Sequence, residues 1–251
     1  MTMADESEHL IQQYAARYGH VGDGLRLLIE SDPEFAGALG DYVAASSEAG
    51  SLEPKIRELL LLAHDVSITN LDRDGAQRRV VKALDAGATE GEIRHVIELV
   101  TMLSLHGLTR GLPMVPGLAT GPGPVASSRG GYWDAFEEAF PAFHQRLEEA
   151  NPAAFTSYQR MGAALWRKGG LEPVWAELVF VVADLSNTHL FTDGAAFHIR
   201  NALHYGATGQ QVVDAVFLTV PSIIRSIDVG FLALQDGLAQ HREEKAHHVA
   251  E

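Results

Sequence analysis

The chain has 251 residues, of which 46% are hydrophobic and 21% charged, so it holds enough apolar material for a substantial core and is not intrinsically disordered. Acidic residues outnumber basic ones by 33 to 19, and the net charge of −14 argues against nucleic acid as a partner. There are no cysteines, which excludes disulfide scaffolds, thiolate metal sites and a cysteine nucleophile.

The N-terminal segment does not resemble a targeting signal. It reads MTMADESEHL and is acidic, whereas a secretory signal begins with basic residues followed by an apolar run. No apolar stretch approaches the ~18 residues that would span a bilayer. We therefore expect a soluble cytoplasmic protein without a membrane partner.

A repeat dominates the chain. The segment that begins LEPKIRELLLLAHD at Leu52 aligns without a gap to the segment that begins LEPVWAELVFVVAD at Leu171, an offset of 119 residues (171 − 52). The identities continue to a Gly-Ala-Thr run at the end of each segment. We predict a duplicated unit of roughly 100 residues, with a first unit at 1–106 and a second at 132–251.

The pattern within each repeat is helical. Apolar residues recur at helical spacing after Pro54, which suits the first turn of a helix. A second stripe ends at Gly87, as is typical of a left-handed C-cap, and Thr89 with Glu92 predicts the capping box of a third helix. The corresponding residues of the second repeat are Pro173, Gly206, Thr208 and Gln211. Alternating apolar–polar runs are scarce, so we predict an all-α fold.

Two further stretches are marked by glycine or proline. Residues 107–131 contain Gly and Pro throughout, so we expect no helix or strand to run through them. They would form a linker between the units or a lid over a pocket. Residues 212–234 form a strongly apolar predicted helix that contains Pro221.

Glu177 and His198 are the leading candidates for acid–base chemistry. Glu177 shares a predicted helix face with Val181 and Asp184, so we expect its carboxylate to be desolvated, with a raised pKa. His198 follows on the adjacent predicted helix, and histidine titrates near neutral pH. The alternative for each is a structural role as a buried, hydrogen-bonded core residue.

Other polar residues of the second repeat are expected near this pair. His189 lies in the connecting turn and is a third candidate catalytic residue. Tyr205 follows His198 on the same predicted helix face, and we expect Tyr205 and Asp184 to contact substrate. No HExxH, GxGxxG or GxSxG motif is present in a suitable context, so no metal site is predicted.

Two arginines are candidates for binding an anionic substrate. Arg79 stands at the first-repeat position that corresponds to His198, and its guanidinium suits a carboxylate but cannot shuttle protons. The alternative is a surface residue on a charged helix. Arg225 lies within the apolar segment near the C-terminus, where it would pair with Asp228 or with a substrate acid. His106 stands alone in the sequence.

The second repeat resembles the carboxymuconolactone decarboxylase family, which includes the alkylhydroperoxidase D-like proteins. The shared pattern is a Glu on one helix and a His eight residues before the Gly that ends the next helix, and Glu177, His198 and Gly206 match it. The first repeat keeps Glu58 but carries Arg79 at the His position. The resemblance covers about two-thirds of the chain and implies two tandem helical-bundle units of the alkylhydroperoxidase D-like type.

The resemblance also narrows the activity that we expect. The peroxidase branch of the family uses a Cys-x-x-Cys pair, and a chain without cysteine cannot perform that thiol chemistry. The decarboxylase branch is similar to this chain in using no thiol, and it implies no metal and no organic cofactor. It also implies a homo-oligomer, either a trimer or a dimer of tandem chains.

We therefore expect a cofactor-independent lyase or isomerase that acts on a small carboxylated lactone or enolisable acid. In this hypothesis Glu177 and His198 move protons, and decarboxylation is the leading reaction. Two alternatives use the same residues. One is a non-catalytic member of the family that binds a small acid, and the other is a hydrolase that opens a lactone or epoxide with an activated water.

Overall fold

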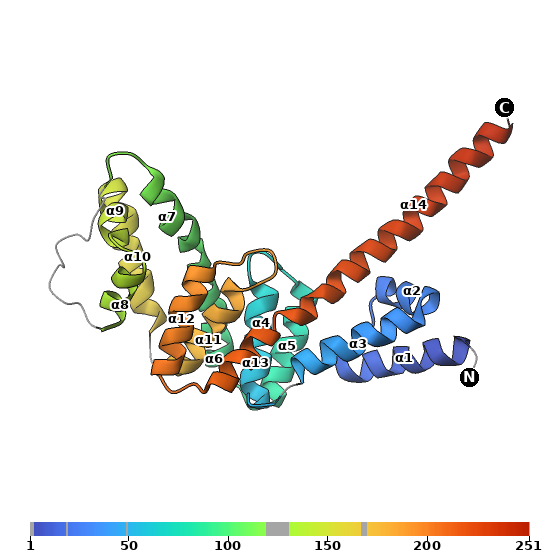
Figure 1. Cartoon of the computed structure of the whole chain (residues 1–251), viewed down its shortest axis with the longest axis horizontal. Coiled ribbons are helices and arrows are strands. Elements are labelled where there is room, and N and C mark those ends of the chain that lie inside the picture. The colour runs from blue at the N-terminus through green and yellow to red at the C-terminus, as the bar shows by residue number, and fades with distance from the viewer. Residues whose placement is uncertain (1–2, 19, 49, 119–130, 167–169, 251) are drawn as a thin grey trace. The chain divides into compact units, whose positions relative to one another are not determined.

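The structure, a computed structural model, describes residues 3–18, 20–48, 50–118, 131–166 and 170–250 (Figure 1). Within these ranges all regular structure is helical and no strand is present, which confirms the predicted all-α fold. In chain order the helices are α1 (Met3–Tyr18), α2 (Asp23–Ser31), α3 (Pro33–Ser47), α4 (Pro54–Val66), α5 (Arg73–Asp85), α6 (Glu90–Val100), η1 (Thr101–Ser104), α7 (Leu105–Gly111), η2 (Leu112–Met114), α8 (Gly131–Ala139), α9 (Phe143–Ala150), α10 (Pro152–Leu165), α11 (Pro173–Asp184), α12 (Thr192–His204), α13 (Gly209–Phe217), η3 (Val220–Ile223) and α14 (Ile224–Ala250).

The chain divides into two compact units. The terminal unit comprises residues 1–50 and 220–251, and the central unit comprises residues 51–219. Both repeated segments fall within the central unit, where α4 of the first packs against α11 of the second. These boundaries differ from the repeat-based division predicted from the sequence, because the two repeats share one core and the two ends of the chain fold together.

The terminal unit is built from α1, α2, α3, η3 and α14. Its buried core consists of Tyr14, Val21, Leu25, Leu28, Ile29 and Ala36. Asp228 of α14 accepts a hydrogen bond of 2.9 Å from the backbone N–H of Leu25, in the first turn of α2. A side chain at Gly24 would place a Cβ 2.3 Å from the carbonyl oxygen of Asp228, so glycine permits this close approach. Asp228, expected as an intrahelical partner of Arg225, therefore caps a helix that is distant in sequence.

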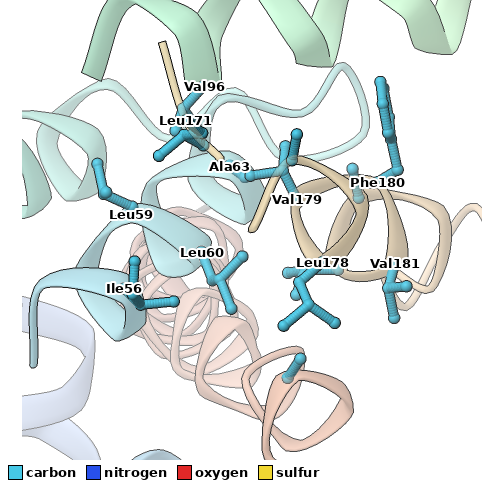
Figure 2. Close-up of a cluster of buried hydrophobic side chains, with 14 of the residues drawn as sticks. Ile56, Leu59, Leu60, Ala63, Val96, Leu171, Leu178, Val179, Phe180 and Val181 are labelled. Carbon is cyan, nitrogen blue, oxygen red and sulfur yellow. The ribbon is translucent and has the colours of Figure 1, made fainter. Parts of the chain in front are cut away.

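The core of the central unit lies where α4 and α11 meet. Figure 2 shows Leu60 and Ala63 of α4 and Leu178 and Val179 of α11 in one apolar cluster. Every residue from 176 to 184 is buried, so α11 is enclosed on all sides. Burial of each large aliphatic side chain stabilises the fold by about 1.5–3 kcal/mol. Any polar side chain on α11 is therefore held away from water by the packing of its apolar neighbours.

The two repeats have the same local structure at equivalent positions. Gly87 follows α5 with a φ of 89°, and Gly206 follows α12 with a φ of 104°, a left-handed conformation that favours glycine. A complete capping box opens the next helix of each repeat, formed by Thr89 with Glu92 and by Thr208 with Gln211. Both predicted helix ends and both predicted helix starts are confirmed, and glutamine serves in the capping box as well as glutamate.

The segment 107–131 differs from its prediction. Its first residues belong to α7 and η2, so a helix does run through the glycines at its start. Leu105 and Thr109 of α7 are buried, and their packing outweighs the ~1 kcal/mol by which a helical glycine is less favourable than alanine. Residues 119–130 lie outside the described residues, and the predicted lid or linker there stays a prediction.

The apolar segment 212–234 is not the single helix that the sequence predicts. α13 ends at Phe217, η3 contains Pro221, and α14 begins at Ile224, because proline lacks an N–H and clashes with the preceding helical turn. By length and composition alone, the stretch Gly209–His247 includes a window apolar enough to cross a membrane, with a mean hydropathy of 1.6 and 17% of the window buried. The prediction that no apolar stretch approaches the length needed to span a bilayer is therefore wrong by this criterion.

Candidate functional site

The hairpin formed by α11 and α12 brings Glu177 and His198 together. Nδ1 of His198 donates a hydrogen bond of 2.7 Å to Oε2 of Glu177, which has no exposed surface. Asn201, nearly one turn after His198, donates to the same oxygen at 3.5 Å. Phe180 stacks on the imidazole with 4.5 Å between ring centroids. The imidazole is thus held by a buried carboxylate at one edge and by an aromatic ring on one face.

This arrangement determines which imidazole nitrogen is available for chemistry. A carboxylate can only accept, so the hydrogen-bond network assigns a proton to Nδ1 of His198. Nε2 has no hydrogen-bond partner among the described residues, and neither has Oε1 of Glu177. A carboxylate behind an imidazole fixes its orientation and stabilises its protonated form. The pair can therefore take up and release a proton at Nε2.

A second imidazole–carboxylate pair includes the last residue of α11. Oδ1 of the fully buried Asp184 lies 3.2 Å from Nε2 of His106, which belongs to α7. Nδ1 of His106 contacts Nε2 of the half-buried His189, in the turn between α11 and α12. Burial raises the pKa of Asp184 to about 7, and burial together with the charges of His189 and His198 lowers the pKa of His106 to about 3. Both shifts favour the uncharged forms, a carboxylic acid beside a neutral imidazole.

A cavity of about 620 Å³ lies beside both pairs, and both His106 and His198 line it. Its aromatic lining residues are Trp133, Phe136, Phe140, Tyr158, Trp166, Phe180, Phe191 and Tyr205. The lining among the described residues includes no lysine and no arginine. The volume and the largely apolar walls with a few polar groups are typical of a small-molecule site.

Two tyrosines contribute hydroxyl groups to the cavity. Oη of Tyr158 lies 3.2 Å from Nε2 of His144, whose Nδ1 in turn contacts Glu137. Burial raises the pKa of Tyr158 to about 12, and burial together with the negative charge of Glu177 raises the pKa of Tyr205. Both phenols therefore stay protonated at neutral pH and are able to donate hydrogen bonds. Tyr205 was predicted from the sequence, whereas Tyr158 was not.

The equivalent residues of the first repeat form a closed cluster of ion pairs. Nη1 of Arg79 lies 3.0 Å from Oε2 of Glu58, and Nε of Arg79 lies 3.6 Å from Oδ2 of Asp65. The side chain of Arg79 is only 18% exposed, so it is not the surface residue that its charged helix suggested. None of the three lines the cavity, and the predicted contact between Arg79 and substrate has no counterpart in this geometry.

The structure therefore gathers only some of the candidate residues. Glu177, His198, Asp184, His189 and Tyr205 come from α11, α12 and the turns that follow them, while Arg225 lies on α14 of the terminal unit. In the described part of the chain, no group of three or more His, Asp or Glu side chains is placed to hold a metal ion.

Sequence reasoning missed His106. Its nearest contact, His189, lies 83 positions later, and no periodic pattern connects residues so far apart. The single available signal was a histidine within a predominantly apolar run, LSLHGL, which is typical of a buried polar group that needs a partner.

Comparison with known proteins gives one informative similarity. The crystal structure of a "putative gamma-carboxymuconolactone decarboxylase subunit" from Burkholderia xenovorans LB400 matches this chain with a TM-score of 0.79 and 28% sequence identity. The match covers 94% of this chain and 98% of that chain. No protein-family model and no curated protein matches. The chain therefore has a carboxymuconolactone decarboxylase-like helical fold.

Proposed function

We propose that the central unit is a cofactor-independent lyase or isomerase that moves a proton on a small lactone or enolisable acid bound in the cavity. The observation that carries the proposal is the hydrogen bond between the buried Glu177 and His198 at the wall of a largely aromatic cavity. Similarity to a protein named as a decarboxylase subunit supports decarboxylation as the reaction.

The chemistry needs one acid in the right place. In decarboxylation of an α,β-unsaturated lactone that carries its carboxylate on the γ-carbon, the bond between the ring and the carboxylate breaks and CO₂ leaves. The electron pair of that bond moves through the conjugated system to the lactone carbonyl and forms a dienolate. His198, protonated at Nε2, then donates this proton to carbon, so that hydrogen replaces CO₂. Glu177 stabilises the imidazolium before the transfer and orients the ring throughout.

Isomerisation uses the same residues in a different order. Nε2 of neutral His198 removes a proton from a carbon atom of the substrate, and the electron pair of the broken C–H bond moves to the carbonyl. The proton then returns to a different carbon atom. The phenol group of Tyr205, protonated at neutral pH, is an available donor for the oxygen that gains charge, whereas the hydroxyl of Tyr158 already donates to Nε2 of His144.

The walls of the cavity also suit this reaction class. The described lining residues supply no lysine or arginine, so a carboxylate bound there would rely on a protonated imidazole for its charge partner. Loss of CO₂ replaces this localised charge with one spread over the dienolate, and a dry, aromatic environment favours the delocalised charge over the localised one. In this proposal an imidazole takes the place of Arg79 as the charge partner of the substrate, since Arg79 pairs with Glu58 and Asp65.

The test is turnover of γ-carboxymuconolactone and of a set of γ-carboxylated α,β-unsaturated lactones and 3-oxo acids in D₂O. CO₂ release and deuterium incorporation into the product are followed by NMR. We expect one deuterium per product and a loss of about 10²–10⁴-fold in kcat for His198→Gln, with a smaller loss for Glu177→Gln. The matched control is Glu58→Gln, the first-repeat equivalent of Glu177, which should keep the activity.

Three results would count against the proposal. Binding of these compounds without CO₂ release or deuterium exchange would favour a non-catalytic binding protein. Ring opening with incorporation of ¹⁸O from labelled water would favour the hydrolase. Full activity of His198→Gln would remove the Glu177–His198 pair from the mechanism whatever the reaction.

A further inference from the structure

Asp184 is a buried acid that the Glu177–His198 pair does not use. It has no exposed surface, and neither of its carboxylate oxygens has a hydrogen-bond partner among the described residues. A Cβ added at Gly194 would lie 2.4 Å from Oδ2 of Asp184, so the backbone of α12 packs closely against the carboxyl group. A polar group buried with so few partners destabilises the fold, which points to a use in function.

Asp184, His106 and His189 form a line from the interior toward the surface. The side chain of Asp184 is 0% exposed, that of His106 is 13% exposed, and His189 is half-buried. Nδ1 of His106 hydrogen-bonds Nε2 of His189, and Nε2 of His106 lies 3.2 Å from Oδ1 of Asp184 without hydrogen-bond geometry. Imidazole suits this position because it accepts a proton on one nitrogen while it releases a proton from the other.

We propose that Asp184, His106 and His189 form a proton relay that exchanges protons between the cavity and solvent. The proposal rests on the proposed function, since the relay would resupply the proton that His198 gives to substrate. In the inward direction, Nε2–H of His189 gives its proton to Nδ1 of His106 while Nε2–H of His106 gives its proton to the ionised Asp184, once their 3.2 Å contact rotates into hydrogen-bond geometry, or to a water molecule in the cavity. His106 gains one proton and loses one, so no charge is left on its buried ring.

The inner end of the relay lies close to the catalytic pair. Asp184 follows Glu177 by seven residues on α11, two helical turns along the same face. The charge of His198 acts on both Asp184 and His106, which shows that the two pairs lie within electrostatic range of each other. Asp184 does not line the cavity, whereas His106 and His198 both do, so the path to His198 would run from His106 through a water molecule in that cavity.

Chemical rescue distinguishes a relay from a structural role. With γ-carboxymuconolactone as the probe, His106→Gln and His189→Gln should each lower kcat about 10- to 100-fold and change KM less than 2-fold. Imidazole or 4-methylimidazole in the buffer should restore most of the kcat of His189→Gln, because a dissolved base replaces the outer member of the relay. The control is His64→Gln, which changes a buried histidine of the first repeat that does not line the cavity.

A second measurement does not depend on turnover. In protein labelled with ¹⁵N-histidine, the ring shifts report which nitrogen of His106 carries the proton. We expect His189→Gln and Asp184→Asn to change the ring shifts of His106, and we expect His64→Gln to leave them unchanged. If the ring shifts of His106 respond to these substitutions but the wild-type protein does not convert γ-carboxymuconolactone, the proposed function fails. The connection between Asp184, His106 and His189 is then still supported.

Two results would overturn the relay itself. The first is full kcat in both His106→Gln and His189→Gln with an active wild type. The second is a loss of kcat that neither imidazole nor 4-methylimidazole restores, together with ring shifts of His106 that do not respond to either neighbour.

Discussion

The hairpin of α4 and α5 and the hairpin of α11 and α12 carry carboxylates at equivalent positions, but these carboxylates have different partners. In the first, Arg79 forms ion pairs with both Glu58 and Asp65. In the second, Glu177 is the one hydrogen-bond partner of His198 among the described residues, and Asp184 lies 3.2 Å from His106 of α7. One substitution at an equivalent position thus separates a closed ion-pair cluster from an open site.

The difference follows from the size and charge of the two side chains. A guanidinium presents several donors and spans two carboxylates, whereas an imidazole reaches one and leaves its second nitrogen free. A permanent charge also stabilises both carboxylates as ions, but an imidazole exchanges its proton near neutral pH. The comparison teaches that a shared scaffold determines where the acids lie, and that the residue opposite them determines whether they form an ion-pair cluster or hold an imidazole at the wall of the cavity.

The largest effect is expected when the second hairpin is made to resemble the first. In His198→Arg, the guanidinium should bridge Glu177 and Asp184, and the site should lose its proton-transfer group. We expect kcat on γ-carboxymuconolactone to fall by about 10³-fold or more while the folded state keeps its stability. Kinetics and urea unfolding measure the two quantities, and an active variant would contradict the assignment.

The reciprocal change should weaken the first hairpin. In Arg79→His, the shorter side chain cannot span both carboxylates, and Asp65 loses its ion pair with residue 79. Removing one partner of a largely buried ion pair costs about 3 kcal/mol, so the midpoint of urea unfolding should fall clearly. The activity should change little, because Arg79 does not line the cavity. Unchanged stability would show that Arg79 does not hold this cluster together.

The smallest effect concerns the pH dependence of stability. Burial raises the pKa of Asp184 to about 7, above its usual value of 3.8, so the folded state holds a proton that the unfolded chain releases between these values. The contribution of Asp184 to stability therefore falls as pH rises through this window. In Asp184→Asn, which cannot ionise, stability relative to wild type should rise by on the order of 2 kcal/mol from pH 4 to pH 7.

The sign of this prediction is specific to Asp184. The lowered pKa of His106 acts in the opposite direction, since the unfolded chain binds the extra proton and stability rises with pH between about 3 and 6.5. His106 is present in both proteins, so the difference between Asp184→Asn and wild type isolates the acid. Urea unfolding at several pH values gives the curve, and a constant difference would show that Asp184 is ionised throughout.

Several features could be predicted because they depend on residues close in sequence. The starts of α4 and α11 at proline, the left-handed glycines and the two capping boxes all follow from contacts within a few residues. The pairing of Glu177 with His198 was also predictable, because it joins two adjacent helices of one hairpin. By contrast, the helix through the glycines of α7 was missed, because burial of its apolar side outweighed local propensity.

What the sequence by itself determined is the helical repeat, the absence of thiol chemistry and the difference between Arg79 and His198. These are local or compositional properties, and no packing is needed to find them. Only the tertiary structure decided that Arg79 is an internal ion-pair partner, that Asp184 lies beside His106, and that aromatic side chains from α8, α10 and α11 and from four positions flanking helices line the cavity. Those contacts join residues distant in sequence, and their positions depend on how the hydrophobic core brings the helices together.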